Sequence, residues 1–197
     1  PIFIKGSGIL LKGLYEDSAE RMIGDIDFLV SKNKYDLVSE ILIENNYKYV
    51  SNLGYHFPQF KHHPRLYNED NIAAVEIHKE LVTEKYASEF NYHFIKNNII
   101  QKNGFSVLSY DDQKALSIFS NQINDHGFRY KTIGLKNAYD FILLNSKKTG
   151  TDFTFHFNKL RTPIMYFIAS VNYMFGELGI DVKHNRKVEK HLQLFKS

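Results

Sequence analysis

The chain has 197 residues, of which 43% are hydrophobic and 15% aromatic. This is enough to bury a substantial core, as one domain or as a domain with a helical extension. The net charge of +3 is too small to require a nucleic-acid partner, although it is compatible with triphosphates or RNA as ligands. The absence of cysteine excludes disulfides, thiolate metal sites and cysteine nucleophiles, and it favours a cytoplasmic location.

The sequence opens at Pro1 and passes directly into the strand-like run Ile2-Phe3-Ile4, which indicates a chain trimmed from, or numbered within, a longer protein. The run ends at Lys5-Gly6-Ser7-Gly8, and apolar residues then recur at helical spacing through Tyr15. We expect a strand, a glycine turn and a helix. The glycines would let the backbone approach a ligand, and amides at the helix start could hold phosphate oxygens. An ordinary strand-to-helix turn accounts for the same residues.

A second predicted strand carries two acids, Asp25 and Asp27, among the apolar residues Ile26, Phe28 and Val30. Because strand side chains alternate between faces, the two carboxylates project from the same face. Aspartate is disfavoured inside strands and is costly to desolvate, so a shared divalent cation would explain the pair. An exposed, half-solvated sheet edge would explain it equally well.

A third acid, Glu76, lies on a later predicted strand, in the segment 73–78. This segment is expected to be the second arm of a hairpin, with His56, Phe57 and Phe60 on the first arm and a turn at 68–71. By the two-residue period of a strand, Glu76 and His78 face one way while Val75 and Ile77 face the core.

The remaining expected elements follow from apolar periodicity and turn residues. In chain order they are a helix over 31–46, a strand over 47–50, a polar helical stretch over 79–98, a turn at 103–104, an edge strand over 105–108, and helices over 109–123, around 139–144 and over 163–175. The run 163–175 falls short of the about 20 residues needed to span a bilayer, so no membrane partner is expected. The basic residues of 183–191 indicate a solvated last helix rather than a nucleic-acid patch.

The three acids and the glycine turn have one joint explanation. Two divalent ions held by three carboxylates can activate a hydroxyl and stabilise the leaving oxygen at a nucleotide's α-phosphate, while the glycine turn holds the other phosphates. Carboxylate ligands without cysteine favour Mg²⁺ or Mn²⁺ over zinc.

Four short motifs carry a resemblance to a known family: Ile4-Lys5-Gly6-Ser7, Leu14-Tyr15, Arg21-x-x-x-Asp25-Ile26-Asp27-Phe28 and Val75-Glu76-Ile77-His78. From Ile2 to about Leu144 the chain resembles the uncharacterised bacterial nucleotidyltransferase family of the DNA polymerase beta superfamily. The lysine-glycine turn and the arginine-then-DxD spacing also resemble abortive-infection nucleotidyltransferase toxins.

The resemblance implies an α+β fold, a small mixed sheet flanked by helices with a C-terminal helical bundle. It implies a nucleotidyltransferase core over 1–108 and a helical region over 109–197 packed on it. The implied activity is Mg²⁺- or Mn²⁺-dependent transfer of a nucleoside monophosphate from an NTP to a hydroxyl of an unidentified acceptor, which could be a small molecule, a protein or RNA. An upstream helix expected in the family would lie before Pro1.

Carried over by position, the resemblance gives Asp25, Asp27 and Glu76 as metal ligands, with Glu76 also able to act as the base for the acceptor hydroxyl. Gly6 and Ser7 would contact the triphosphate. Lys5 and Arg21 could each meet phosphate charge, although Arg21 could equally pair with an acid. His78 is expected to pack beside Glu76 or support it rather than ligate metal.

Two rival interpretations remain. One is a catalytically inactive member of the fold that binds a nucleotide or a partner. The other is a metal hydrolase built on His56, His62, His63 and His78, whose spacing lacks the helical His-x-x-x-His pattern of such sites.

Overall fold

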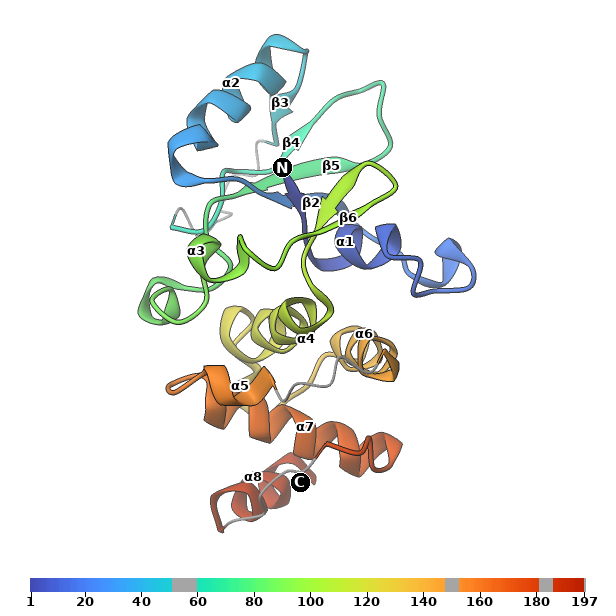
Figure 1. Cartoon of the computed structure of the whole chain (residues 1–197), viewed down its shortest axis with the longest axis vertical. Coiled ribbons are helices and arrows are strands. Elements are labelled where there is room, and N and C mark those ends of the chain that lie inside the picture. The colour runs from blue at the N-terminus through green and yellow to red at the C-terminus, as the bar shows by residue number, and fades with distance from the viewer. Residues whose placement is uncertain (51–59, 148–152, 181–185, 197) are drawn as a thin grey trace. The chain divides into compact units, whose positions relative to one another are not determined.

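The computed structural model describes residues 1–50, 60–147, 153–180 and 186–196. These residues form two compact units, Pro1–Ser109 and Tyr110–Ser197. The first unit contains a sheet with helices on it, and the second is built from helices (Figure 1). This architecture confirms the predicted α+β class. Within the described ranges, none of the helices is long and apolar enough to cross a membrane.

The first unit is organised on a seven-stranded mixed sheet with the strand order β3-β4-β5-β2-β1-β7-β6. Its strands are β1 (Ile2–Phe3), β2 (Asp25–Leu29), β3 (Lys48–Tyr49), β4 (Leu66–Tyr67), β5 (Ala74–His78), β6 (Ile100–Lys102) and β7 (Phe105–Val107). At the centre of the sheet, β2 runs parallel to β5 and antiparallel to β1. The site residues of the sequence analysis fall on or beside these central strands.

The two faces of the β2–β5 pair have different compositions, as the strand period predicts. One face is apolar and packs under α2 (Tyr35–Glu44). The buried cluster between them consists of Phe28, Val30, Val75 and Ile77 from β2, β5 and the residue after β2, with Leu66 of β4 and Tyr35 of α2. The opposite face carries Asp27 and Glu76, which are directly paired in the parallel register. The short helix α1 (Lys5–Leu11) contacts β1, β2 and β7.

The glycine turn expected at residues 5–8 is wrong in form, because these residues are already the first turn of α1. The change of direction is made one residue earlier, where extended Ile4 is followed by Lys5 with a left-handed φ of 50°. A non-glycine residue in this region costs about 1 kcal/mol or more. The strain therefore lies at a residue that contacts the acids.

The hairpin that ends in β5 is confirmed, but its first arm is β4 rather than the segment around Phe60. His56 and Phe57 lie outside the described residues. His62 still reaches β5 through an isolated antiparallel bridge with His78.

The polar helix expected over 79–98 is wrong. The structure has only a 3-10 turn at Glu84–Tyr86 and the four-residue α3 (Tyr92–Ile95) there. Asn91 is the N-cap of α3, and its side chain accepts a hydrogen bond from the Phe94 amide. The turn at Asn103–Gly104 joins β6 to β7 and is confirmed by the positive φ of both residues. The edge strand is β6, not the expected β7, since β7 is hydrogen-bonded on both sides.

The second unit contains the expected helices with adjusted bounds: α4 (Tyr110–Phe119), which continues as a π-helical turn (Ser120–Asn124), α6 (Leu135–Ser146), α7 (Arg161–Phe175) and α8 (Arg186–Lys196). The short helix α5 (Gly127–Tyr130) was not expected. The apolar helix α7 packs against α4, α5 and α8. Pro163 lies in the first turn of α7 but not at its first position, which Arg161 occupies.

Candidate functional site

Three acidic side chains lie on one face of the β2–β5 pair. Asp27 and Glu76 are 4% and 6% exposed and stand opposite each other, and Asp25 lies two residues before Asp27 on the same strand. Burying carboxylates costs several kcal/mol unless cations or donors pair with them. The structure supplies such partners from outside the two strands.

Lys5 is the first partner. Its Nζ lies 2.5 Å from Asp27 Oδ1 and 3.5 Å from Glu76 Oε2, so a single ammonium joins the two strands. Burial alone would lower the pKa of Lys5, but the neighbouring carboxylates of Asp27 and Glu76 outweigh it and raise the pKa above its ordinary value. Lys5 therefore stays charged between the acids.

Arg65 is the second partner, and the sequence analysis missed it. Its Nη2 lies 2.7 Å from Asp25 Oδ2 and 3.4 Å from Glu76 Oε1. Arg65 immediately precedes β4, and β4 pairs with β5, the strand that carries Glu76. A basic residue next to a predicted neighbour of an acid-bearing strand was the one sequence signal for this contact. Glu76 is thus shared by two cations, one on each carboxylate oxygen.

His78 completes the group from the end of β5. Its Nε2 lies 2.8 Å from Asp27 Oδ1 and 3.4 Å from Glu76 Oε2. Its ring packs beside that of His62, with centroids 4.9 Å apart. Burial, and then the neighbouring His78 ring, lower the pKa of His62 to about 4, so His62 is neutral at physiological pH. This leaves His62 as a neutral neighbour of the acids.

The three carboxylates do not titrate alike. Burial, with the nearby charges of Asp27 and Glu76, raises the pKa of Asp25 to about 6 despite Arg65 and Lys5. Burial acts in the same direction on Asp27, but Lys5 and the hydrogen bond to His78 outweigh it and hold the pKa below its ordinary value. The pKa of Glu76 is lowered in the same way, by His78 and Lys5 against burial. At neutral pH the face therefore carries concentrated negative charge matched by fixed cations.

Ser7 and Gly6 hold α1 against this strand. The Ser7 hydroxyl accepts a hydrogen bond from the Asp27 amide at 3.1 Å and lies 3.5 Å from the Asp25 carbonyl. A Cβ added at Gly6 would lie 2.6 Å from Ile23 Cγ2 and 3.2 Å from the Arg21 guanidinium. Glycine at position 6 is therefore required by close packing.

Arg21 is buried, and its Nη1 donates to the Met22 carbonyl at 2.7 Å. The guanidinium lies close to Gly6, at the Lys-Gly-Ser segment. Of the predicted nucleotide-binding residues, Lys5 and Ser7 contact Asp27 directly, and Gly6 and Arg21 lie next to each other.

A metal ion could be held by part of this group. Asp27, Glu76 and His78 each offer one ligand atom, and these atoms lie within 4.8 Å of one another. The two carboxylate oxygens suit Mg²⁺ or Mn²⁺, whereas the imidazole is a ligand typical of transition metals. Asp25 is joined to this set through Arg65 rather than belonging to it. The donor set therefore fits a divalent ion, and it includes His78, which the sequence analysis did not expect as a ligand.

The other described histidines do not assemble a second site around these acids, and His56 lies outside the described residues. His63 stacks on Tyr35 with ring centroids 3.9 Å apart, and His62 Nδ1 donates a hydrogen bond to the His63 carbonyl oxygen at 2.7 Å. Among the described residues, His78 is the only histidine in the candidate ligand group. A hydrolase site built on several histidines gains no support from this geometry.

An α+β protein with acids converging from two parallel strands, beside a helix that begins Lys-Gly-Ser, has the build of a nucleotidyltransferase. The chain belongs to a family described as uncharacterised nucleotidyltransferase, whose model matches residues 1–161. The family resemblance drawn from the motifs is confirmed at this level. Neither the comparison with curated proteins nor the comparison with solved structures found a match.

Proposed function

We propose that this chain transfers a nucleoside monophosphate from an NTP to a hydroxyl group of an acceptor, with Mg²⁺ or Mn²⁺ as the metal. One observation carries the proposal: Asp27 and Glu76 stand opposite each other in the register of β2 and β5, with Asp25 on the same face. Family membership supports the type of reaction. The motifs further suggest the bacterial branch within the DNA polymerase beta superfamily, and an NTP substrate is consistent with a cytoplasmic location.

In this proposal Asp27 and Glu76 hold the metal with His78 as the third candidate ligand, and Asp25 would join them on release from Arg65. A bound divalent ion would polarise the α-phosphate and lower the pKa of the attacking hydroxyl. Glu76 is the candidate acceptor for the proton of that hydroxyl. The hydroxyl oxygen forms a bond to the α-phosphorus, the bond from this phosphorus to the β-phosphate oxygen breaks, and pyrophosphate leaves.

The NTP would lie against the segment that begins α1. Lys5 and Arg21 supply positive charge there, and Gly6 and Ser7 bring the backbone close to β2. Lys5 would pass from its present carboxylate partners toward phosphate oxygens when the metal takes over the acids. The buried Arg21 would keep its orientation through the Met22 carbonyl.

A second candidate is a catalytically inactive member that binds a nucleotide or a partner. It is favoured by the pairing of all three acids with Lys5 and Arg65, which stabilises the carboxylates without metal. The two candidates differ in whether a nucleoside monophosphate is transferred from the NTP to an acceptor. A toxin role, suggested by the likeness to abortive-infection proteins, would require the first.

The test is incubation of the protein with each labelled NTP, Mg²⁺ or Mn²⁺, and acceptors drawn from small hydroxylated molecules, proteins and RNA. We expect Asp27→Asn and Glu76→Gln each to reduce label transfer by about 10²-fold or more, since each removes charge that the metal requires.

The matched controls are Asp70→Asn and Glu44→Gln, whose side chains are exposed in the same unit and lie outside the acidic group. They should transfer label as the wild type does. Label transfer by Asp27→Asn at the wild-type level would contradict the role of Asp27 as a metal ligand. No transfer by the wild type with any NTP, together with retained nucleotide binding, would establish the inactive alternative.

A further inference from the structure

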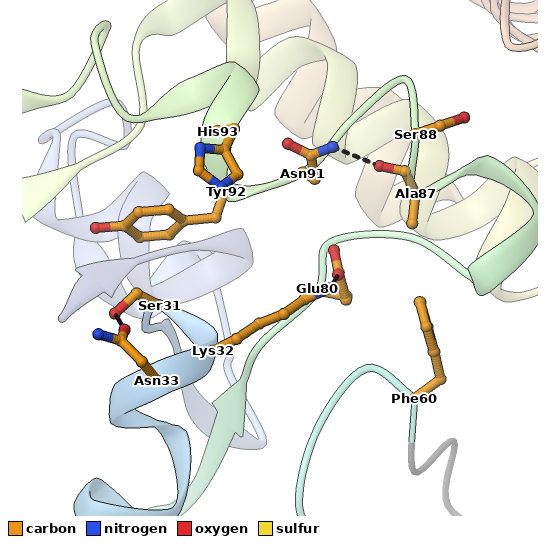
Figure 2. A pocket seen from close by; sticks show the side chains of 10 residues that line it. All are labelled: Ser31, Lys32, Asn33, Phe60, Glu80, Ala87, Ser88, Asn91, Tyr92 and His93. Carbon is orange, nitrogen blue, oxygen red and sulfur yellow. Dashed lines mark hydrogen bonds and ion pairs between the residues drawn. The ribbon is translucent and has the colours of Figure 1, made fainter.

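A second candidate site lies in the first unit, where β2 and β5 end. A cavity of about 610 Å³ is lined by Ser31, Lys32, Asn33, Phe60, Glu80, Ala87, Ser88, Asn91, Tyr92 and His93 (Figure 2). Ser31 follows Leu29 at the end of β2, and Glu80 follows His78 at the end of β5. Crevices beyond the carboxyl ends of parallel strands are common ligand sites, and this volume suits a small molecule. None of the proposed metal ligands lines the cavity.

Glu80 is the unusual residue of this cavity. It is 2% exposed, and one carboxylate oxygen, Oε1, is paired with the Lys32 ammonium. The other oxygen, Oε2, is buried without a hydrogen-bond partner among the described residues. A buried carboxylate oxygen left unsatisfied costs about 1–3 kcal/mol or more, so a donor from a ligand would be stabilising there.

The charges around Glu80 select the kind of donor. Lys32 already neutralises the carboxylate, so a second ammonium would meet the positive charge of Lys32 at close range. An anionic group would meet Glu80 itself. A neutral hydroxyl, in contrast, can donate to Oε2 without either conflict.

The walls of the cavity suit a hydroxylated molecule. Asn91 is fixed, because its amide donates to the Ala87 carbonyl at 2.6 Å and its oxygen accepts from the Phe94 amide. Figure 2 shows the Lys32 chain running toward Glu80, with Phe60 on the far side of the carboxylate. The Lys32 Nζ lies 5.9 Å from the centre of the Phe60 ring. Asn91 is thus held in place by its own segment, and Phe60 supplies an aromatic surface near the Lys32–Glu80 pair.

We propose that this cavity binds a small, neutral, polyhydroxylated molecule, one of whose hydroxyls donates to Glu80 Oε2. The Lys32 side chain is 66% exposed and unbranched, so it can shift to admit the hydroxyl at little cost. The proposal concerns binding alone and goes beyond nucleotide transfer, because it requires neither NTP nor metal.

The test compares ligands of one shape and different charge. Binding of D-glucose, D-glucosamine and D-glucose 6-phosphate, with myo-inositol and maltose as further neutral probes, is measured by saturation-transfer NMR and calorimetry without NTP or metal. We expect at least one neutral probe to show binding at ligand concentrations up to about 20 mM, and glucose to bind more tightly than its charged analogues.

Two variants locate the binding. Glu80→Gln keeps the shape but replaces the carboxylate with an amide, and should weaken the neutral probe about tenfold. Ala87→Met fills the cavity while leaving the Lys32–Glu80 pair in place, and should abolish binding. Glu84→Gln, on the neighbouring 3-10 turn, is the matched control and should bind as the wild type does. Thermal unfolding of each variant verifies the fold, and Ala87→Met provides a test even if Glu80→Gln unfolds.

Three results would overturn the proposal: no neutral probe binds, the ammonium or phosphate analogue binds more tightly, or binding survives both Glu80→Gln and Ala87→Met. Because the binding measurement uses no NTP, a negative result does not bear on the transferase proposal. An absence of label transfer likewise does not bear on the binding of a neutral molecule in this cavity.

Discussion

Lys5 gives the acidic face a cation of its own, and this has a measurable consequence. Its ammonium lies between Asp27 and Glu76, where an entering metal ion would compete with it. We expect Lys5→Met to bind Mn²⁺ about tenfold or more tightly than the wild type, because the carboxylates lose their resident positive charge. Without metal the same variant should unfold at a lower temperature, since two buried acids lose a partner.

The measurement is Mn²⁺ titration by electron paramagnetic resonance, with thermal unfolding in the presence and absence of Mn²⁺. Lys48→Met is the matched control, because Lys48 is exposed on β3 and pairs with Glu69 instead. Unchanged or weaker Mn²⁺ binding by Lys5→Met would contradict an ion site at Asp27 and Glu76.

Gly6 is a second residue whose role can be isolated. A Cβ at this position would lie 2.6 Å from Ile23 Cγ2 and 3.2 Å from the Arg21 guanidinium, so one of these neighbours must move. We expect Gly6→Ala to lower the free energy of unfolding by about 1–3 kcal/mol, as measured by urea denaturation.

Gly24→Ala is the control for this change, since a Cβ at Gly24 meets no atom within 4 Å. It should leave the stability within about 0.5 kcal/mol of the wild type. Equal effects of the two substitutions would mean that close packing over Gly6 is not what requires glycine there.

At the scale of elements, the contact of α7 with α8 predicts a pH dependence. His191 of α8 is buried, its Nε2 lies 3.2 Å from Ser170 Oγ, and its ring stacks on Tyr166 of α7. Burial, and then the charge of Lys131, lower the pKa of His191 to about 4 from an ordinary value of 6.5.

Between pH 6.5 and 4 the unfolded chain therefore binds a proton that the folded chain does not. The stability that this histidine contributes is fully present above pH 6.5 and is lost as the pH falls toward 4. We expect a loss of about 1–2 kcal/mol, after allowing for solvent screening, and His191→Gln should remove that part of the pH dependence.

Urea denaturation at pH 7.5 and pH 4.5 tests this expectation. His93→Gln, at an exposed histidine of α3, is the control and should keep the wild-type pH dependence. A wild type and a His191→Gln variant with the same change in stability between the two pH values would contradict the buried, neutral histidine.

Elements were predictable where the residue pattern was strong. The alternation in β2, the apolar length of α7 and the Asn103–Gly104 turn led to correct elements, because local sterics and burial decide them. The helix over 79–98 was wrong because its buried residues, such as Leu81, Val82 and Phe90, satisfy tertiary contacts without a helical repeat. Tertiary packing overrode the helical propensity there.

For the whole molecule, the sequence indicated which acidic residues share a strand face, but not which residues of distant segments contact them. The two-residue period places Asp25 with Asp27, and Glu76 with His78. It does not give the register between strands far apart in the chain, which is what pairs Asp27 with Glu76. Arg65 enters from irregular chain before β4, where no period applies, so only the assembled sheet reveals its contacts.

The strand order of the sheet also bears on how the molecule behaves in concentrated solution. In the part of the chain that the structure describes, its two edges are β3, of two residues, and β6, of three, and each carries an exposed lysine, Lys48 and Lys102. Long, uncharged edge strands recruit strands from other molecules, whereas short, charged edges resist this. The sheet edges thus protect the chain against aggregation.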